Sequence, residues 1–167
     1  MIYVLRLVHI LSGAFWYGSL IFIARFLMPS IRAAGPAAGP VMAQLNQRNL
    51  SLGMMGAGIL NVASGIWLIL IVSGGTPGPW MQSGMGRTLG IGAALAIVAL
   101  LVGMIVVAPV TRRMGALSAA IAKRGGPPSP EEMAEMGRLQ QRNGVGTAII
   151  ATLLTITVVA MAVARYV

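Results

Sequence analysis

Four long stretches of the chain are almost free of charged side chains and rich in aliphatic ones. They cover residues 7–24, 50–73, 88–111 and 143–164. Each reaches or exceeds the roughly 18 consecutive residues that mark a candidate transmembrane helix. Two long arginine-rich connections and one short turn rich in glycine and proline separate the stretches. The pattern therefore predicts four helices that cross a membrane up and down.

The helices are expected to continue past the apolar stretches on the side of the long connections. Ser129, Pro130 and Glu132 form a pattern typical of a helix start, and Gly39-Pro40 indicates a similar start for the second helix. We therefore predict an all-α integral membrane protein, a four-helix bundle extended on the cytoplasmic side. It forms one domain over residues 1–167, with helices over about 2–33, 40–73, 87–123 and 130–165.

The chain also carries an internal repeat. Pro29 and Pro109 each stand three residues before an arginine, late in the first and third helices. An Arg-Asn pair, at 48–49 or at 142–143, then precedes the next apolar stretch. Anionic lipid head groups or capping within the bundle are the favoured partners of these pairs, with an anionic ligand or another subunit as the alternative. We interpret the chain as two helical hairpins in tandem.

Composition supports the membrane assignment. Apolar residues make up 57% of the chain and charged residues only 9%, which is too little charge to cover a water-soluble domain of 167 residues. The net charge of +9 does not indicate nucleic-acid binding, because the cations flank apolar runs. The absence of cysteine excludes disulfides, thiolate metal sites and cysteine nucleophiles.

The distribution of cations predicts the orientation. Nine of the twelve lysine and arginine residues lie in or beside the two long connections, and three lie on the other side. By the positive-inside rule, the long connections face the cytoplasm and both termini face outward.

His9 is the only histidine, and it lies inside the first apolar stretch. An ionisable side chain is costly there and is a reason to suspect function. Successive members of the set Arg6, His9, Gly13 and Trp16 are three or four residues apart, which places them on one helix face. A neutral imidazole there could bind haem iron or copper, Arg6 could pair with a haem propionate, and Gly13 leaves room for a flat ligand or a neighbouring helix.

The role of His9 and the identity of a second metal ligand remain open at this stage. His9 could simply hydrogen-bond to a neighbouring helix or reach the interface. Met161 lies at a similar depth and could be a second metal ligand, although packing is the favoured interpretation for a methionine. A five-coordinate haem, or one shared across a dimer, is the further possibility.

Other polar residues in the apolar stretches are few. Asn61 lies near the middle of the second stretch, with Ser64 one turn on, and we interpret it as joining two helices by a hydrogen bond. The three glutamates all lie in the connection before the last stretch. The absence of a membrane carboxylate argues against proton-coupled transport and against acid–base hydrolysis.

The first helix resembles a known group of proteins. His9, the run Trp16-Tyr17-Gly18, Arg25 and Pro29 are similar to the first-helix pattern of small bacterial four-helix membrane proteins of the CopD-like and HemJ-like group. The resemblance implies a haem b-binding redox protein or a copper-handling one in the bacterial cytoplasmic (inner) membrane, with His9 as the ligand. The further histidines and the lysine expected of protoporphyrinogen oxidation are absent.

The leading hypothesis is a haem b protein with a redox or electron-transfer role, whose cofactor pocket includes His9, Arg6, Gly13 and Trp16. A copper-handling protein that uses His9 and methionines is one alternative. A non-catalytic membrane subunit of a larger complex is another. The expected partners are the lipid bilayer and a homodimer or larger membrane complex, and no nucleic acid.

Overall fold

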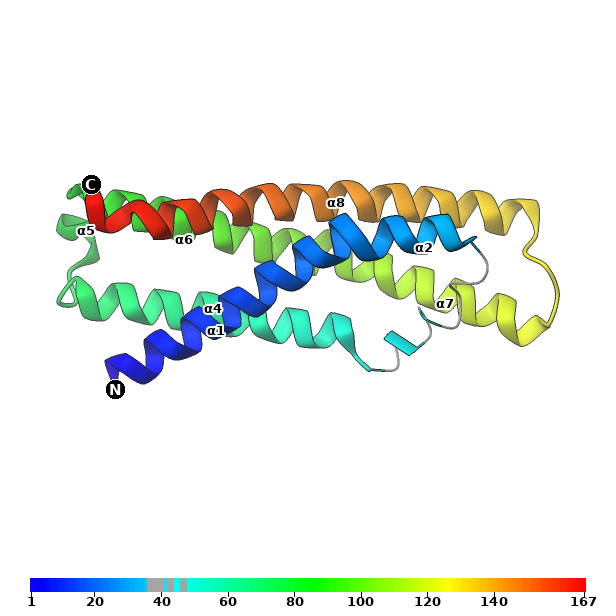
Figure 1. Cartoon of the computed structure of the whole chain (residues 1–167), viewed down its shortest axis with the longest axis horizontal. Helices are drawn as coiled ribbons and strands as arrows, with labels where there is room; N and C mark the ends of the chain where they lie inside the picture. The colour runs from blue at the N-terminus through cyan, green and yellow to red at the C-terminus, as the bar shows by residue number, and fades with distance from the viewer. Residues whose placement is uncertain (36–40, 42–43, 46–47) are drawn as a thin grey trace.

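A computed structural model describes residues 1–35, 41, 44–45 and 48–167, and every regular element within these ranges is helical (Figure 1). Four helical segments are long and apolar enough to cross a membrane. They are Ile2–Ala34, Leu50–Val72, Gly84–Arg124 and Pro130–Tyr166. The predicted all-α class and the four candidate membrane spans are confirmed in the described ranges.

The first and the third of these four segments are each interrupted by a short π-helix, and the four segments are built as follows. The first comprises α1 (Ile2–Phe22), a π-helical turn (Ile23–Leu27) and α2 (Met28–Ala34). The second is α4 (Leu50–Val72), and a single turn, α5 (Pro77–Trp80), follows it. The third comprises α6 (Gly84–Val102), a π-helical turn (Gly103–Val107) and α7 (Ala108–Arg124). The fourth is α8 (Pro130–Val163), which ends in a 3₁₀ turn (Ala164–Tyr166).

The two π-helical turns lie at equivalent positions of the sequence repeat. Each begins six residues before a proline, Pro29 or Pro109. The residue just before each proline donates its N–H to a carbonyl five positions back, from Met28 to Ile23 and from Ala108 to Gly103. The proline ring crowds the carbonyl four residues earlier, and a wider turn relieves this crowding.

The start of α8 follows the sequence signal. The Ser129 hydroxyl accepts a hydrogen bond from the Glu132 N–H at 3.2 Å, and a Glu132 carboxylate oxygen accepts one from the Ser129 N–H at 2.7 Å. The predicted cap is therefore confirmed. The third helix begins three residues earlier than expected, because the Ser83 hydroxyl caps it by accepting from the Gly86 N–H.

The second helix differs from the expectation of a continuous helix over residues 40–73. Asn49 has a φ of 54°, in the left-handed region, and α4 begins only at Leu50. A right-handed helix cannot run through a residue in that conformation, so the helix is not continuous at this point. The expected start at Gly39-Pro40 lies outside the described residues.

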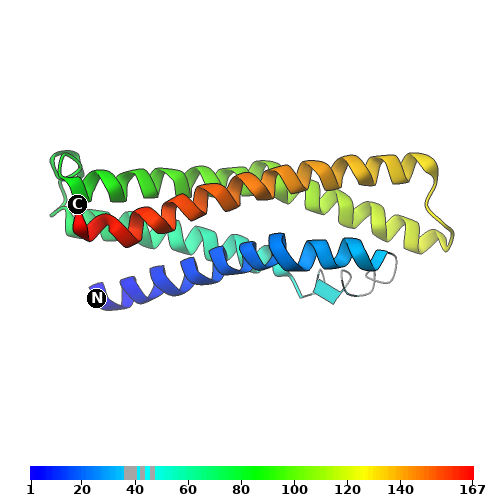
Figure 2. The same ribbon diagram turned by 45° about the horizontal axis from the view of Figure 1, so that its top comes forward.

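The helices pack mainly in two pairs, α1 with α4 and α6 with α8, and α4 also contacts α6. Figures 1 and 2 both show α8 running beside the α6–α7 segment along its length, with both chain termini at the end that carries α5. The central core contains side chains from α1, α6 and α8. Its buried members are Trp16, Leu20, Ala99, Ile150 and Leu154. The outward faces carry many exposed large apolar side chains, which is compatible with contact with a lipid bilayer.

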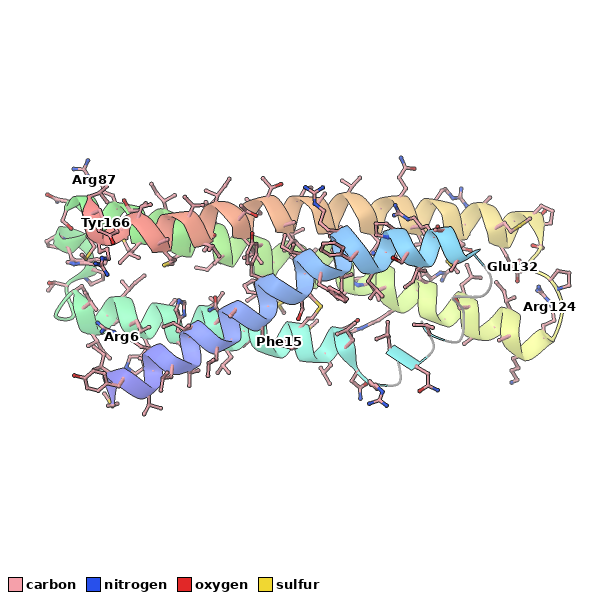
Figure 3. The ribbon with its side chains drawn as sticks, viewed as in Figure 1. Arg6, Phe15, Arg87, Arg124, Glu132 and Tyr166 are labelled. Atoms are coloured by element: carbon pink, nitrogen blue, oxygen red, sulfur yellow. The ribbon has the colours of Figure 1, made fainter. Side chains whose placement is uncertain are left out.

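The ion pairs of the described residues lie toward one end of the bundle, where α7 is followed by α8. Figure 3 shows Arg124 and Glu132 beside the turn between α7 and α8, and Arg6 near the opposite end. Arg124 donates to both Glu132 carboxylate oxygens, at 2.7 and 2.8 Å. These bonds, followed by the Ser129 N–H, lower the pKa of Glu132 to about 2.

Candidate functional site

The face of α1 that carries His9 packs directly on α4. An ideal Cβ built on Gly65 would lie 2.9 Å from His9 Cε1, and one built on Gly13 would lie 2.6 Å from Asn61 Nδ2. Neither position therefore has room for a larger residue unless its neighbour moves. The two glycines let the helices approach closely enough for His9 and Asn61 to hydrogen-bond across the contact.

Trp16 continues the same contact about two turns beyond His9 along α1. Its indole ring lies 2.9 Å from an ideal Cβ on Gly58, and it is only 6% exposed. The three contacts pair positions in a constant antiparallel register. His9 and Trp16 are seven residues apart, as are Gly58 and Gly65 on α4. The equal spacings are visible in the sequence, but they do not indicate which residue of α4 lies opposite which residue of α1.

The hydrogen bonds of His9 determine which ring nitrogen carries the proton. His9 Nδ1 lies 2.9 Å from the carbonyl oxygen of Asn61, and a carbonyl can only accept, so Nδ1 carries the hydrogen and donates. Asn61 Nδ2 donates in return to the carbonyl oxygen of His9 at 2.8 Å. The Ser64 hydroxyl lies 3.3 Å from Nδ1. The predicted role of Asn61, a hydrogen bond between two helices, is confirmed.

The second ring nitrogen of His9 is available to a ligand. Nε2 forms no hydrogen bond with any described residue, and no buried side-chain nitrogen or oxygen in the described part of the chain lacks a partner. Because Nε2 has no partner and no partnerless side-chain nitrogen of the described residues is buried, Nε2 is accessible. With Nδ1 protonated, the neutral ring presents an unprotonated Nε2, which is the form that binds metal ions.

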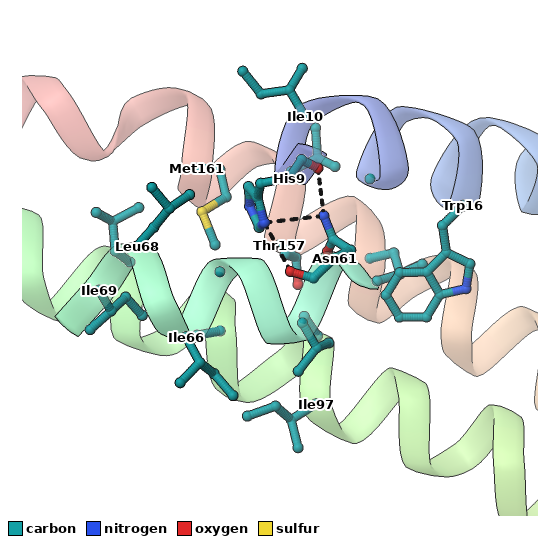
Figure 4. A pocket seen from close by; sticks show the side chains of 18 of the residues that line it. His9, Ile10, Trp16, Asn61, Ile66, Leu68, Ile69, Ile97, Thr157 and Met161 are labelled. Carbon is teal, nitrogen blue, oxygen red and sulfur yellow. Dashed lines mark hydrogen bonds between the residues drawn. The ribbon is translucent and has the colours of Figure 1, made fainter. Parts of the chain in front are cut away.

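His9 borders a cavity of about 670 Å³ between the helices. The cavity brings together the candidate residues Arg6, His9, Gly13, Trp16 and Met161. Most of the remaining lining is aliphatic, and Figure 4 shows His9, Met161 and Thr157 among the labelled side chains around it. Trp80 and Thr157 also line the cavity and were not expected from the sequence. Their proximity depends on how α5 and α8 are placed, which the local pattern does not reveal.

Two candidate residues have packing contacts of their own. The room that Gly13 leaves is occupied by the Asn61 amide, so of its two expected roles the contact with a neighbouring helix is the one observed. The methyl group of Met161 lies 3.2 Å from an ideal Cβ on Gly92, so Met161 packs on α6 as well as lining the cavity. Thr157 supports the same helix contact by donating to the Gly92 carbonyl oxygen at 3.2 Å.

The described residues contain no group of three or more His, Cys, Asp and Glu side chains that could hold a metal ion. Any metal at this site would therefore rely on His9 together with methionine, a prosthetic group or an external ligand. No family model, curated protein or solved structure matches this chain. The functional argument therefore rests on the geometry of the site.

Proposed function

We propose that this chain is a membrane haem b protein with a redox or electron-transfer role, in which His9 Nε2 supplies one axial ligand. The observation that carries the proposal is the 2.9 Å hydrogen bond from His9 Nδ1 to the Asn61 carbonyl oxygen. Metal-binding histidines almost always donate the other ring N–H to such an acceptor, which fixes the tautomer and raises the basicity of the free nitrogen. His9 thus has the support that an axial ligand needs.

The size and lining of the cavity support a largely apolar cofactor with anionic edge groups. Its volume of about 670 Å³ lies within the range of roughly 300–1,000 Å³ that is typical of cofactor sites. Arg6 lines the cavity and would pair with a propionate, and Trp16 with the aliphatic lining would exclude water. Bound haem supplies one-electron transfer. Met161 is the candidate for the second axial position, and the alternatives are a five-coordinate haem or a site shared by two chains.

The proposal includes membership of the CopD-like and HemJ-like group and a topology in a bacterial inner membrane. In that topology the chain is two tandem hairpins and both termini are periplasmic. The last turns of α7 and the first turns of α8 extend into the cytoplasm. The cation distribution supports this orientation, since most arginines lie toward the end opposite the termini. The paired packing of α1 with α4 and of α6 with α8 supports the hairpins.

The decisive experiment is an absorption spectrum of the full chain, purified in mild detergent after expression with ample haem. We expect a Soret band that is lost in His9→Ala and partly restored by added imidazole, because imidazole can occupy the space left by the side chain. Helicity and elution volume check that the variant folds. Gly56→Ala is the matched control on α4, because an ideal Cβ there meets nothing within 4 Å.

If the chain expressed with ample haem shows no Soret band, the proposal is refuted. A Soret band that is unchanged in His9→Ala would also refute it. Metal analysis of the same samples separates the alternatives. Stoichiometric copper that is lost in His9→Ala would indicate the copper-handling function instead. A co-purifying protein with neither cofactor would indicate a non-catalytic subunit.

A further inference from the structure

A second cavity lies between the α6–α7 segment and α8, toward the arginine-rich end of the bundle. It has a volume of about 410 Å³, and two arginines contribute to its lining. Its lining residues are Val102, Val106, Arg138, Gln141, Arg142, Val145, Gly146 and Ile149. We refer to these eight residues as the arginine groove. Those from α8 recur at helical spacings of three and four, so they form one stripe along the helix.

The arginine groove has a polar end and an apolar end. Thr111 donates a hydrogen bond to Asn143 at 3.3 Å, and an ideal Cβ on Gly146 would lie 2.9 Å from Val107. These contacts place residue 111 level with 143, and residue 107 level with 146. Val106 and Ile149 therefore lie on the side of the uncharged runs, and Arg142 lies at their border. Arg138 is one turn further out, about 6 Å along the helix.

No acidic side chain pairs with the arginines of this groove in the described residues. The whole sequence contains three acidic residues, all in the first turns of α8. Glu132 binds Arg124, Glu135 binds Arg113 at 2.9 Å, and Glu131 accepts from the Ser129 hydroxyl. Neither groove arginine forms an ion pair or hydrogen bond with another described residue. Two like charges one turn apart repel each other, so an external anion would stabilise this arrangement.

We propose that the arginine groove binds one anionic phospholipid from the bilayer. Arg138 and Arg142 hold the phosphate, Gln141 supplies a further polar contact, and an acyl chain lies along Val106, Val145 and Ile149. The position of Arg142 at the border of the uncharged runs supports a phospholipid, because a phospholipid has its phosphate at the membrane surface and its acyl chains directly beneath. Basic pockets between transmembrane helices are known to select anionic head groups in this way. A free anion would gain nothing from the apolar half.

The test uses the full chain in nanodiscs of phosphatidylcholine with a minor fraction of spin-labelled phosphatidylglycerol. Electron paramagnetic resonance gives the fraction of labelled lipid that is immobilised on the protein, and hence its preference over labelled phosphatidylcholine. An arginine near an anionic head group contributes roughly fivefold in binding. We expect Arg142→Gln to lower the preference about fivefold, and Arg138→Gln/Arg142→Gln to lower it roughly 30-fold.

Arg112→Gln is the matched control. Arg112 follows Thr111, which is level with Asn143, so it carries the same charge at the same depth as Arg142 but does not line the groove. We expect it to change the preference less than about twofold. If Arg142→Gln and Arg112→Gln lower the preference for the anionic lipid equally, the preference comes from general attraction to the charged surface, and the proposal is overturned. A wild-type chain without preference for the anionic lipid, or displacement of the lipid by millimolar glycerol phosphate, would also overturn it.

Discussion

Gly58→Ala tests whether the close contact of α1 and α4 holds the bundle together. An added methyl group would lie 2.9 Å from Trp16 Cε2 and 3.1 Å from Leu100 Cδ1. The indole ring is rigid and buried in the central core, so it cannot make way by rotating a flexible end. Either the ring or the whole of α1 must shift.

The magnitude follows from two opposing effects. Overpacking a well-filled contact costs typically about 1–3 kcal/mol. Replacing glycine by alanine within a helix gains up to about 1 kcal/mol. Gly56→Ala, two residues away on the same helix, has the second effect only, because an ideal Cβ at Gly56 meets nothing within 4 Å. The difference in unfolding free energy between the two variants therefore isolates the packing cost, and we expect about 1–3 kcal/mol.

The assay is reversible unfolding of the purified full chain in mixed micelles, with increasing sodium dodecyl sulfate. Tryptophan fluorescence and far-ultraviolet circular dichroism report on the transition, and they should give one midpoint if unfolding is two-state. Gly58→Ala should unfold at a lower detergent fraction than wild type, and Gly56→Ala at the same or a higher one. Equal midpoints for the two variants would refute the close contact between Gly58 and Trp16.

Two further predictions concern stability. The Arg124 and Ser129 bonds lower the pKa of Glu132 from its ordinary 4.5 to about 2, so its contribution is complete above pH 4.5 and is lost as the pH falls toward 2. The thermal midpoint of wild type should thus fall more steeply than that of Glu132→Gln over this window; parallel curves would contradict the ion pair. Asn61→Leu removes the 2.8 Å bond to the His9 carbonyl and should cost about 0.6–1.7 kcal/mol in the micelle assay. A Soret band, if present, should survive, since the Asn61 backbone carbonyl remains; its loss would mean that the side chain itself holds the site.

The sequence predicted the elements that depend on local chemistry. A long uncharged run forms a helix in a membrane because no water is available for unpaired backbone groups. The α8 cap was predictable because Ser129 and Glu132 exchange hydrogen bonds with backbone groups only three residues away. The positive φ of Asn49 was not predicted. Asn49 lies in the connection before α4, and the local sequence does not determine the path of that connection.

The candidate site divides in the same way. Helical periodicity places Arg6, His9, Gly13 and Trp16 on one face from the sequence alone, since 3.6 residues per turn is a property of the backbone. The apolar run around His9 also indicates, from the sequence alone, that this isolated histidine needs a hydrogen-bond partner. These statements require no knowledge of any other helix.

Only the tertiary structure decided what that face contacts. The register of α1 on α4 sets Gly65 opposite His9 and makes the Asn61 carbonyl its acceptor, which leaves Nε2 accessible. The placement of α8 brings Met161 to the same cavity. These contacts join residues more than fifty positions apart, and they depend on which helices pack together and at what height. Periodicity reveals the direction in which a side chain faces along its own helix, but only packing determines its neighbour.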